Sequence, residues 1–161
     1  MPYEALRDPF GIAFWPNFKG RDGCRTPMPW VDHAGGGFSR GVPWLPVPAE
    51  HLPLAVSRQE HDPESPLHGF RRFLRWRREQ PALRWGAIRF LELPEPLLGF
   101  TRQLDGQTVL AVFNLGGQAQ ETPLPLAGPV TAVNGHGLQS GRVDGTVALL
   151  PPHGVLFATV S

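Results

Sequence analysis

The chain has 161 residues, a formal net charge of +1, one cysteine, 19 glycines and 19 prolines. Its near-neutral charge gives no electrostatic reason for binding to nucleic acid or to a membrane surface, and the single cysteine excludes an internal disulfide framework. The opening residues lack the features of a signal peptide, and no apolar run is long enough to span a bilayer. We therefore expect a cytoplasmic protein with no nucleic-acid or membrane partner.

Residues 1–60 are expected to form a long irregular segment. They are crowded with proline and glycine, including the triplet at residues 35–37, and show neither helical nor strand periodicity. Proline fixes φ and glycine permits positive φ, so together they prescribe a rigid but irregular path. Aromatic residues such as Phe14 and Trp15 argue against disorder. Because a compact domain should not begin with so long a structureless loop, we interpret the chain as a piece of a larger protein.

The most informative stretch is the run GRDGCRTPMPW at residues 20–30. It has two arginines, an aspartate and a tryptophan, but no apolar periodicity that would indicate core packing. Such a run is typical of a fixed surface loop whose polar groups converge on a ligand. We interpret Asp22 as a residue that orders the loop and its arginines rather than as a nucleophile, and Cys24 as a small filler.

A helix is predicted to begin after Ser65, the N-cap, with Pro66 at its first position, and to end before Pro81. Apolar residues cover about half of the helical wheel: Leu67, Phe70, Phe73, Leu74 and Trp76. Four arginines, at positions 71, 72, 75 and 78, cover much of the other half and favour a solvated face over a nucleic-acid patch. Arg77 falls inside the apolar arc, so it must donate to a carboxylate or to carbonyls at the seam between helix and strands.

Short strands are predicted from Ala87 onward, at residues 87–93, 97–103, 108–114, 130–133, 146–149 and 155–160. Asp105-Gly106 predicts a type I′ hairpin turn, because both positions of such a turn need positive φ. The last strand is expected to pack alternate apolar residues inward. The predicted fold is mainly β: an antiparallel β-sandwich at residues 85–161, preceded by a helix at residues 61–84 and the irregular segment.

Residues 20–30 resemble the loop after the last barrel strand of bacterial α-glucosidases and oligo-1,6-glucosidases of the α-amylase superfamily, glycoside hydrolase family 13. Further similarity lies in QPALR at residues 80–84, VFNL at residues 112–115 and the closing LPPHG at residues 150–154. The resemblance implies that residues 1–60 follow the eighth strand of a TIM barrel, that residues 61–84 are the eighth helix, and that residues 85–161 are the C-terminal β-sandwich.

The chemistry that this resemblance implies is retaining hydrolysis of terminal α-linked glucose in short oligosaccharides of the maltose or isomaltose type. It needs two carboxyl groups about 5 Å apart. In the family these groups, and a third carboxylate, come from strands before the loop, so we expect no catalytic residue here and no activity of the chain alone. No cofactor is implied, and the histidines lack the spacing of metal ligands.

The resemblance assigns substrate contacts to Arg21, Arg25 and Trp30. Arg21 is implied to bind hydroxyls of the terminal glucose, a task that suits the fixed fork of a guanidinium. Arg25 either contacts the sugar or braces the carbonyls of the loop. Trp30, with Phe38 and Trp44, either forms an aromatic wall for the sugar or packs the loop on the barrel.

Other interpretations of the sequence remain open. Glu60, His61 and Asp62 combine two carboxylates with a histidine, although their place before a helix favours a structural role. The whole chain could instead be a non-catalytic β-sandwich module that binds a glycan or a partner protein. A nucleic-acid-binding role for the arginine-rich helix would show as affinity that falls steeply with salt.

Overall fold

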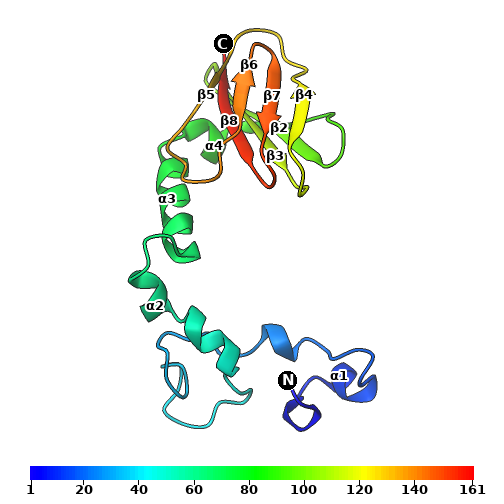
Figure 1. Ribbon diagram of the computed structural model, residues 1–161, viewed down its shortest axis with the longest axis vertical. Coiled ribbons are helices and arrows are strands. Elements are labelled where there is room, and N and C mark those ends of the chain that lie inside the picture. The colour runs from blue at the N-terminus through cyan, green and yellow to red at the C-terminus, as the bar shows by residue number, and fades with distance from the viewer. The chain divides into compact units, whose positions relative to one another are not determined.

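The computed structural model describes residues 1–161, which divide into two compact units, residues 1–68 and residues 69–161. The second unit carries eight strands in two antiparallel sheets (Figure 1). The expectation of a mainly β fold, with a sandwich preceded by a helix and an irregular segment, is therefore confirmed. No helix has the length and apolar content needed to cross a membrane.

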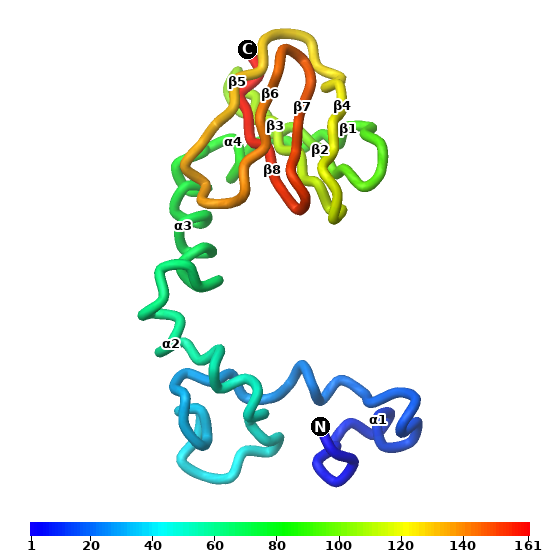
Figure 2. Tube along the Cα trace, in the orientation of Figure 1, coloured from blue at the N-terminus to red at the C-terminus, as the bar shows by residue number.

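The first unit contains no strand, and much of its trace follows an irregular path (Figure 2). Its regular elements are all short: η1 (Tyr3–Ala5), α1 (Pro9–Ala13), η2 (Asp22–Cys24), η3 (Ala49–Leu54) and α2 (Val56–Glu60). Frequent proline and glycine prevent longer elements, because proline removes backbone donors and glycine adds conformational freedom.

Backbone hydrogen bonds fix the segment around Trp30. The Trp30 N–H donates to the carbonyl of Gly36 at 2.7 Å, across a turn whose glycine has φ of 59°. The carbonyls of Pro29 and Trp30 accept the N–H groups of Val56 and Ser57, the first residues of α2. The irregular path is thus fixed by backbone hydrogen bonds, both within a turn and between residues 29–30 and residues 56–57.

Helix α3 (Pro66–Arg78) begins where the sequence predicts. The Ser65 hydroxyl accepts the N–H of His68 at 3.4 Å and donates to the carbonyl of Gln59 at 2.8 Å. Ser65 therefore caps the helix and also ties it to the end of α2. The helix stops at Arg78, and α4 (Pro81–Trp85) starts with proline at its first position.

The faces of α3 follow the helical wheel with one exception. Trp76 is buried and the four grouped arginines are exposed, whereas Phe70 is 62% exposed although it lies in the apolar arc. Arg77 is half-buried and donates from Nη2 to the carbonyl of Leu83 in α4 at 3.0 Å. Its predicted need for an acceptor is met by a carbonyl.

The strands are β1 (Ala87–Leu91), β2 (Leu97–Leu104), β3 (Gln107–Asn114), β4 (Gln120–Pro123), β5 (Val130–Ala132), β6 (Arg142–Asp144), β7 (Val147–Leu150) and β8 (Val155–Val160). One sheet has the order β1-β2-β3-β8-β5 and the other β4-β7-β6. Asp105 and Gly106 have φ of 48° and 79° in the turn between β2 and β3, which confirms the predicted hairpin.

Strands β4 and β6 are absent from the sequence prediction. Both are edge strands of the small sheet, of four and three residues. Pro123 at the end of β4 cannot donate to a ladder, so proline there is tolerated only at an edge. Such short strands show no clear alternation of apolar and polar residues.

The five-stranded sheet is buried on both faces. Leu110 of β3 and Leu156 of β8 face the small sheet. Val109 and Phe157, their neighbours in the same strands, pack on the other face with Trp76 of α3 and with residues of α4. Alternate residues of β8 do pack inward, toward the small sheet, as predicted; the residues between them are buried as well, because a layer of helices covers the second face.

Candidate functional site

Two buried aspartates organise the loop at residues 20–30, which we call the arginine loop. Asp22 is fully buried, and its Oδ2 accepts the N–H groups of Arg7 at 2.6 Å and Asp8 at 2.8 Å. Asp8, 4% exposed, accepts the N–H of Phe10 on Oδ1 and that of Arg21 on Oδ2, both at 3.0 Å. The two carboxylates therefore interlock residues 7–10 with residues 21–22.

Glycine at two positions allows these segments to approach each other. A Cβ at Gly20, where φ is 69°, would lie 2.9 Å from the Cβ of Asp8. A Cβ at Gly11 would lie 2.7 Å from the carbonyl oxygen of Lys19. Side chains at either position would push the start of the arginine loop away from Asp8, which explains the glycine that opens the run at residues 20–30.

The structure brings Arg21 and Arg25 to the same carboxylate. Arg21 Nε lies 3.8 Å and Arg25 Nη1 lies 3.6 Å from Oδ2 of Asp8. Their side chains remain 71% and 39% exposed, while that of Asp8 is 5% exposed. Each guanidinium carries five N–H donors, so both keep donors for a ligand beyond the ion pair. The arginine loop thus presents two cations from one buried anchor.

The environment of Asp8 favours its charged form. The backbone N–H of Arg21 lowers the pKa of Asp8 below its ordinary value of 3.8, against the opposing effect of burial. The N–H of Phe10 and the guanidinium of Arg25 act in the same direction as Arg21. A carboxyl group held ionised in this way cannot serve as a general acid near neutral pH.

Trp30 is held by a separate set of contacts, the hydrogen bonds to Gly36 and to α2 described above. Its side chain is 52% exposed, as Phe38 is 58% and Trp44 is 65% exposed. These rings are therefore accessible for contact with a sugar or with another protein surface. Trp44 lines a hollow of about 570 Å³ that includes Pro43, Pro46 and Arg7.

His61, Asp62 and His68 make contacts that serve local structure. Asp62 accepts the N–H of Glu64 at 2.9 Å and lies at the entry to α3. His61 pairs with the carbonyl of Ser57 and His68 with that of Glu60. No group of three metal-ligating side chains occurs in the structure. These contacts favour the structural interpretation of residues 60–62 over a catalytic one.

His136 is a buried histidine that the sequence analysis did not single out. It is 1% exposed, and its ring packs against Trp76 at 5.4 Å and Phe157 at 5.1 Å between centroids. The N–H of Leu138 donates to Nδ1, so the proton is on Nε2, which donates to the hydroxyl of Ser140 at 3.3 Å. In this tautomer His136 cannot take a proton from Ser140, and the pair is not a catalytic dyad.

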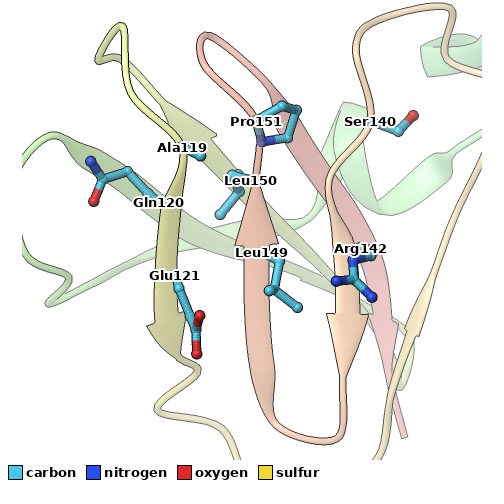
Figure 3. A pocket seen from close by; sticks show the side chains of 8 residues that line it. All are labelled: Ala119, Gln120, Glu121, Ser140, Arg142, Leu149, Leu150 and Pro151. Carbon is cyan, nitrogen blue, oxygen red and sulfur yellow. The ribbon is translucent and has the colours of Figure 1, made fainter.

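A groove of about 440 Å³ runs over the small sheet (Figure 3). Glu121 of β4, Leu149 of β7 and Arg142 of β6 lie opposite one another in register across it. The groove contains a single carboxylate and no aromatic ring. It therefore lacks both the acid pair of a glycosidase and the stacking surface typical of a sugar site.

The comparisons with known proteins agree with the fold and the loop. The model of the alpha-amylase family, for the catalytic domain, matches residues 4–86. The chain therefore belongs to the alpha-amylase family. The resemblance to bacterial α-glucosidases of glycoside hydrolase family 13 is confirmed.

Individual relatives place the chain more narrowly within that family. It is 47% identical, over all 161 residues, to the "Probable alpha-glucosidase" of Rhizobium meliloti, of which it covers 29%. It is 32% identical over 108 residues, 66% of the chain, to the oligo-1,6-glucosidase of Halalkalibacterium halodurans, of which it covers 19%.

A solved structure extends the match to three dimensions. The crystal structure of the alpha-glucosyl transfer enzyme XgtA matches 99% of the chain with a TM-score of 0.91 and 48% identity. The chain covers 30% of that structure. The two-sheet β architecture of residues 87–160 thus matches the C-terminal β domain of an enzyme of this family, and the chain spans less than a third of the length of these relatives.

The structure also shows what the sequence analysis missed in the loop. Asp8 was not among the candidate site residues, although it contacts both arginines. Its signal is an aspartate directly before Pro9, the pattern of an N-cap followed by proline at the first helical position. That pattern predicts the cap on Phe10, whereas the contact with Arg21 depends on a close approach of two segments.

Proposed function

We propose that this chain is the C-terminal segment of an α-glucosidase that releases terminal α-linked glucose from short oligosaccharides of the maltose or isomaltose type. The observation that carries the proposal is the arginine loop, in a chain 47% identical along its length to a probable α-glucosidase. Residues 1–60 would follow the eighth barrel strand, residues 61–84 would be the eighth helix and residues 85–161 the C-terminal β domain.

In this proposal the substrate contacts come from Arg21, Arg25 and Trp30. The exposed guanidinium of Arg21 would donate to vicinal hydroxyls of the terminal glucose, and Arg25 would act beside it from the same anchor. The exposed face of Trp30 would contact the C–H groups of the sugar.

The chain alone is proposed to be inactive. Retaining hydrolysis needs a nucleophilic carboxylate and a proton-donating carboxyl group about 5 Å apart and open to the substrate. Asp22 in the arginine loop and Asp8 next to it are buried carboxylates, yet they already accept backbone N–H groups and are closed to solvent. Burial excludes both carboxylates as nucleophiles, and the lowered pKa of Asp8 further excludes it as the proton donor, so the three catalytic carboxylates would have to come from the rest of the enzyme.

Glucosyl transfer is a second candidate, favoured by the 48% identity to an alpha-glucosyl transfer enzyme. Both reactions share a first step in which an enzyme carboxylate forms a bond to the anomeric carbon and the protonated leaving group departs. In hydrolysis, water then attacks that carbon, loses its proton to the enzyme and displaces the enzyme carboxylate. In transfer, a sugar hydroxyl does so and a new glycosidic bond forms.

A chimaera tests both candidates. This chain would replace the 161 matched residues of the Rhizobium meliloti relative, which supplies the remainder of an enzyme of this family. We expect the chimaera to release p-nitrophenol from its α-glucoside and the isolated chain to release none above a heat-treated control. Oligosaccharides formed from added maltose would favour transfer over hydrolysis.

Activity of the isolated, contaminant-free chain would contradict the assignment of the catalytic groups to other segments. If the isolated chain instead binds maltose without turnover and the chimaera is inactive, the alternative of a glycan-binding β module replaces the proposal. We place the parent enzyme in the cytoplasm, where the exposed thiol of Cys24 would remain reduced.

A further inference from the structure

We propose that Asp8 is a positioning residue for the two substrate-binding arginines. The inference rests on the proposed function, because it gives Arg21 and Arg25 their purpose. It concerns a residue outside the arginine loop that meets both arginines through one oxygen atom.

The two carboxylate oxygens of Asp8 have different partners. Oδ1 accepts the N–H of Phe10 and caps α1. Oδ2 accepts the N–H of Arg21 and is the atom nearest to both guanidinium groups. Oδ1 thus stabilises the local structure of α1. Oδ2 fixes the backbone at the start of the arginine loop and lies near the guanidinium groups of Arg21 and Arg25.

The Asp8 end of the two ion pairs is buried and fixed, whereas the guanidinium ends are more exposed. The Asp8 side chain is 5% exposed, and its Oδ2 accepts the N–H of Arg21 at 3.0 Å. Asp22 in turn binds the N–H of Asp8 at 2.8 Å, so the backbone that carries the anchor is itself fixed. The guanidinium groups of Arg21 and Arg25 remain partly exposed to solvent, which leaves their other N–H donors available for a ligand.

Arginine needs such an anchor because its long side chain loses much rotamer freedom when it binds a ligand. A neighbouring carboxylate restricts the guanidinium before the sugar arrives, which lowers the cost of ordering it on binding. Ground state and transition state share this binding to distant hydroxyls. Loss of the anchor should therefore raise KM more than it lowers kcat.

Asp8→Ser separates the two oxygens. Serine keeps a good N-cap for Phe10 and lacks the second oxygen, so α1 should persist while the arginines lose their partner. In the chimaera we expect KM to rise about tenfold, because two ion pairs that restrict the arginines are lost, with kcat within about twofold. Asp62→Ser, at an exposed aspartate that also accepts a backbone N–H, is the matched control and should leave both constants unchanged.

Asp8→Ser in a background that lacks both arginines distinguishes positioning from a general structural role. In an Arg21→Ala, Arg25→Ala background, Asp8→Ser should raise KM by less than about twofold, because nothing remains to be positioned. An undiminished effect there would contradict the proposal. If the arginine variants themselves leave KM unchanged, the proposed substrate contacts fail instead.

The isolated chain gives a readout that needs no activity. We expect the amide proton of Arg21 to follow the titration of Asp8 below pH 4 in an NMR experiment, and to lose this dependence in Asp8→Ser. Asp8→Asn provides a second variant, in which an amide replaces one oxygen. If the chemical shift of the Arg21 amide proton does not change with pH in the unsubstituted chain, the positioning role is contradicted, whatever the activity of the chimaera.

Discussion

The two units of the chain are ordered by different forces. Residues 69–161 bury two apolar clusters, one between the sheets and one between the large sheet and the helices. In residues 1–68 the buried side chains include two aspartates, and backbone hydrogen bonds to carboxylates and carbonyls fix the path. The comparison shows that the candidate binding loop lies in the part with the smaller apolar core.

Exposure of aromatic residues sharpens this contrast. Seven aromatic side chains of the first unit are exposed, Phe10 and Trp44 among them, whereas the longer second unit has three, Phe70, Trp85 and Phe90. Exposed apolar patches of this kind mark surfaces that contact something else. In the parent enzyme that we propose, these side chains would pack against preceding segments of the barrel.

Hydrogen exchange should show the largest difference between the units. In the isolated chain we expect amides before Ser65 to exchange faster than those in the strands by about a hundredfold or more, since local opening follows the buried apolar area. The chain should also associate at moderate concentration through its exposed aromatic residues. Exchange read residue by residue, with sedimentation of the same sample, checks both expectations.

Uniform protection in a monodisperse monomer would break the comparison. It would mean that the two units unfold as one and that the chain behaves as a complete domain. A self-standing binding module would then explain the chain better than a segment of a larger enzyme.

Truncation of a core leucine should give the next largest effect. Leu110 is fully buried between the sheets, so Leu110→Ala should lower the free energy of unfolding of the second unit by about 2–5 kcal/mol. Leu115→Ala, at a residue 63% exposed just after the same strand, is the control and should change it by less than about 1 kcal/mol. Urea unfolding followed by circular dichroism of the strands measures both.

An equal loss of structure around the arginine loop in Leu110→Ala would contradict separate stabilisation of the units. The amide resonances of Arg7 and Asp8, which bind Asp22, report on that loop. If the first unit depends on its own polar contacts, the urea midpoint of these two resonances should be the same in Leu110→Ala as in the unsubstituted chain.

Much of the structure from Ser65 onward could be predicted from the sequence because its signals are local. Alternating apolar residues, the Asp105-Gly106 turn and the Ser65-Pro66 helix start each depend on neighbours in the chain. The burial of both faces of β8 could not be predicted in this way. It requires that α3 and α4 return to cover the sheet, a contact between distant segments.

The candidate site was predictable only in part for the same reason. The pattern of residues 20–30 indicated a binding loop, and the family resemblance suggested Arg21 and Arg25 as its candidate substrate contacts. Asp8 lies 13 residues before Arg21, and their contact depends on the interlocking aspartates and on the room left by Gly20. No periodicity or spacing rule in the sequence predicts such an approach.

Removal of the Asp22 carboxylate should have a smaller but more local effect. Asp22→Ala leaves the N–H groups of Arg7 and Asp8 without their acceptor, at a cost of about 1–3 kcal/mol. We expect both amide protons to shift upfield in NMR spectra while the strands keep their stability. Asp32→Ala, at an exposed aspartate paired with Arg58, is the control and should leave these two amides unchanged. Loss of strand stability in Asp22→Ala would show that the anchor supports both units.

The smallest expected effect concerns pH and the second unit. Burial lowers the pKa of His136 below its ordinary value of 6.5, because a charged imidazole is disfavoured among Trp76 and Phe157. The unfolded chain therefore binds a proton before the folded one does. Stability from this group is complete above pH 6.5 and is lost as the pH falls through the lowered value. Protonation would also place a hydrogen on Nδ1, opposite the N–H of Leu138, and the nearby Arg72 side chain adds positive charge beside Gly137.

Urea midpoints of the strands at pH 7.5 and pH 5.5 should differ in the unsubstituted chain and differ less in His136→Gln. His61→Gln, at an exposed histidine in the first unit, should leave the difference unchanged. A pH dependence that survives in His136→Gln but disappears in His61→Gln would assign it to the first unit and reverse this part of the comparison.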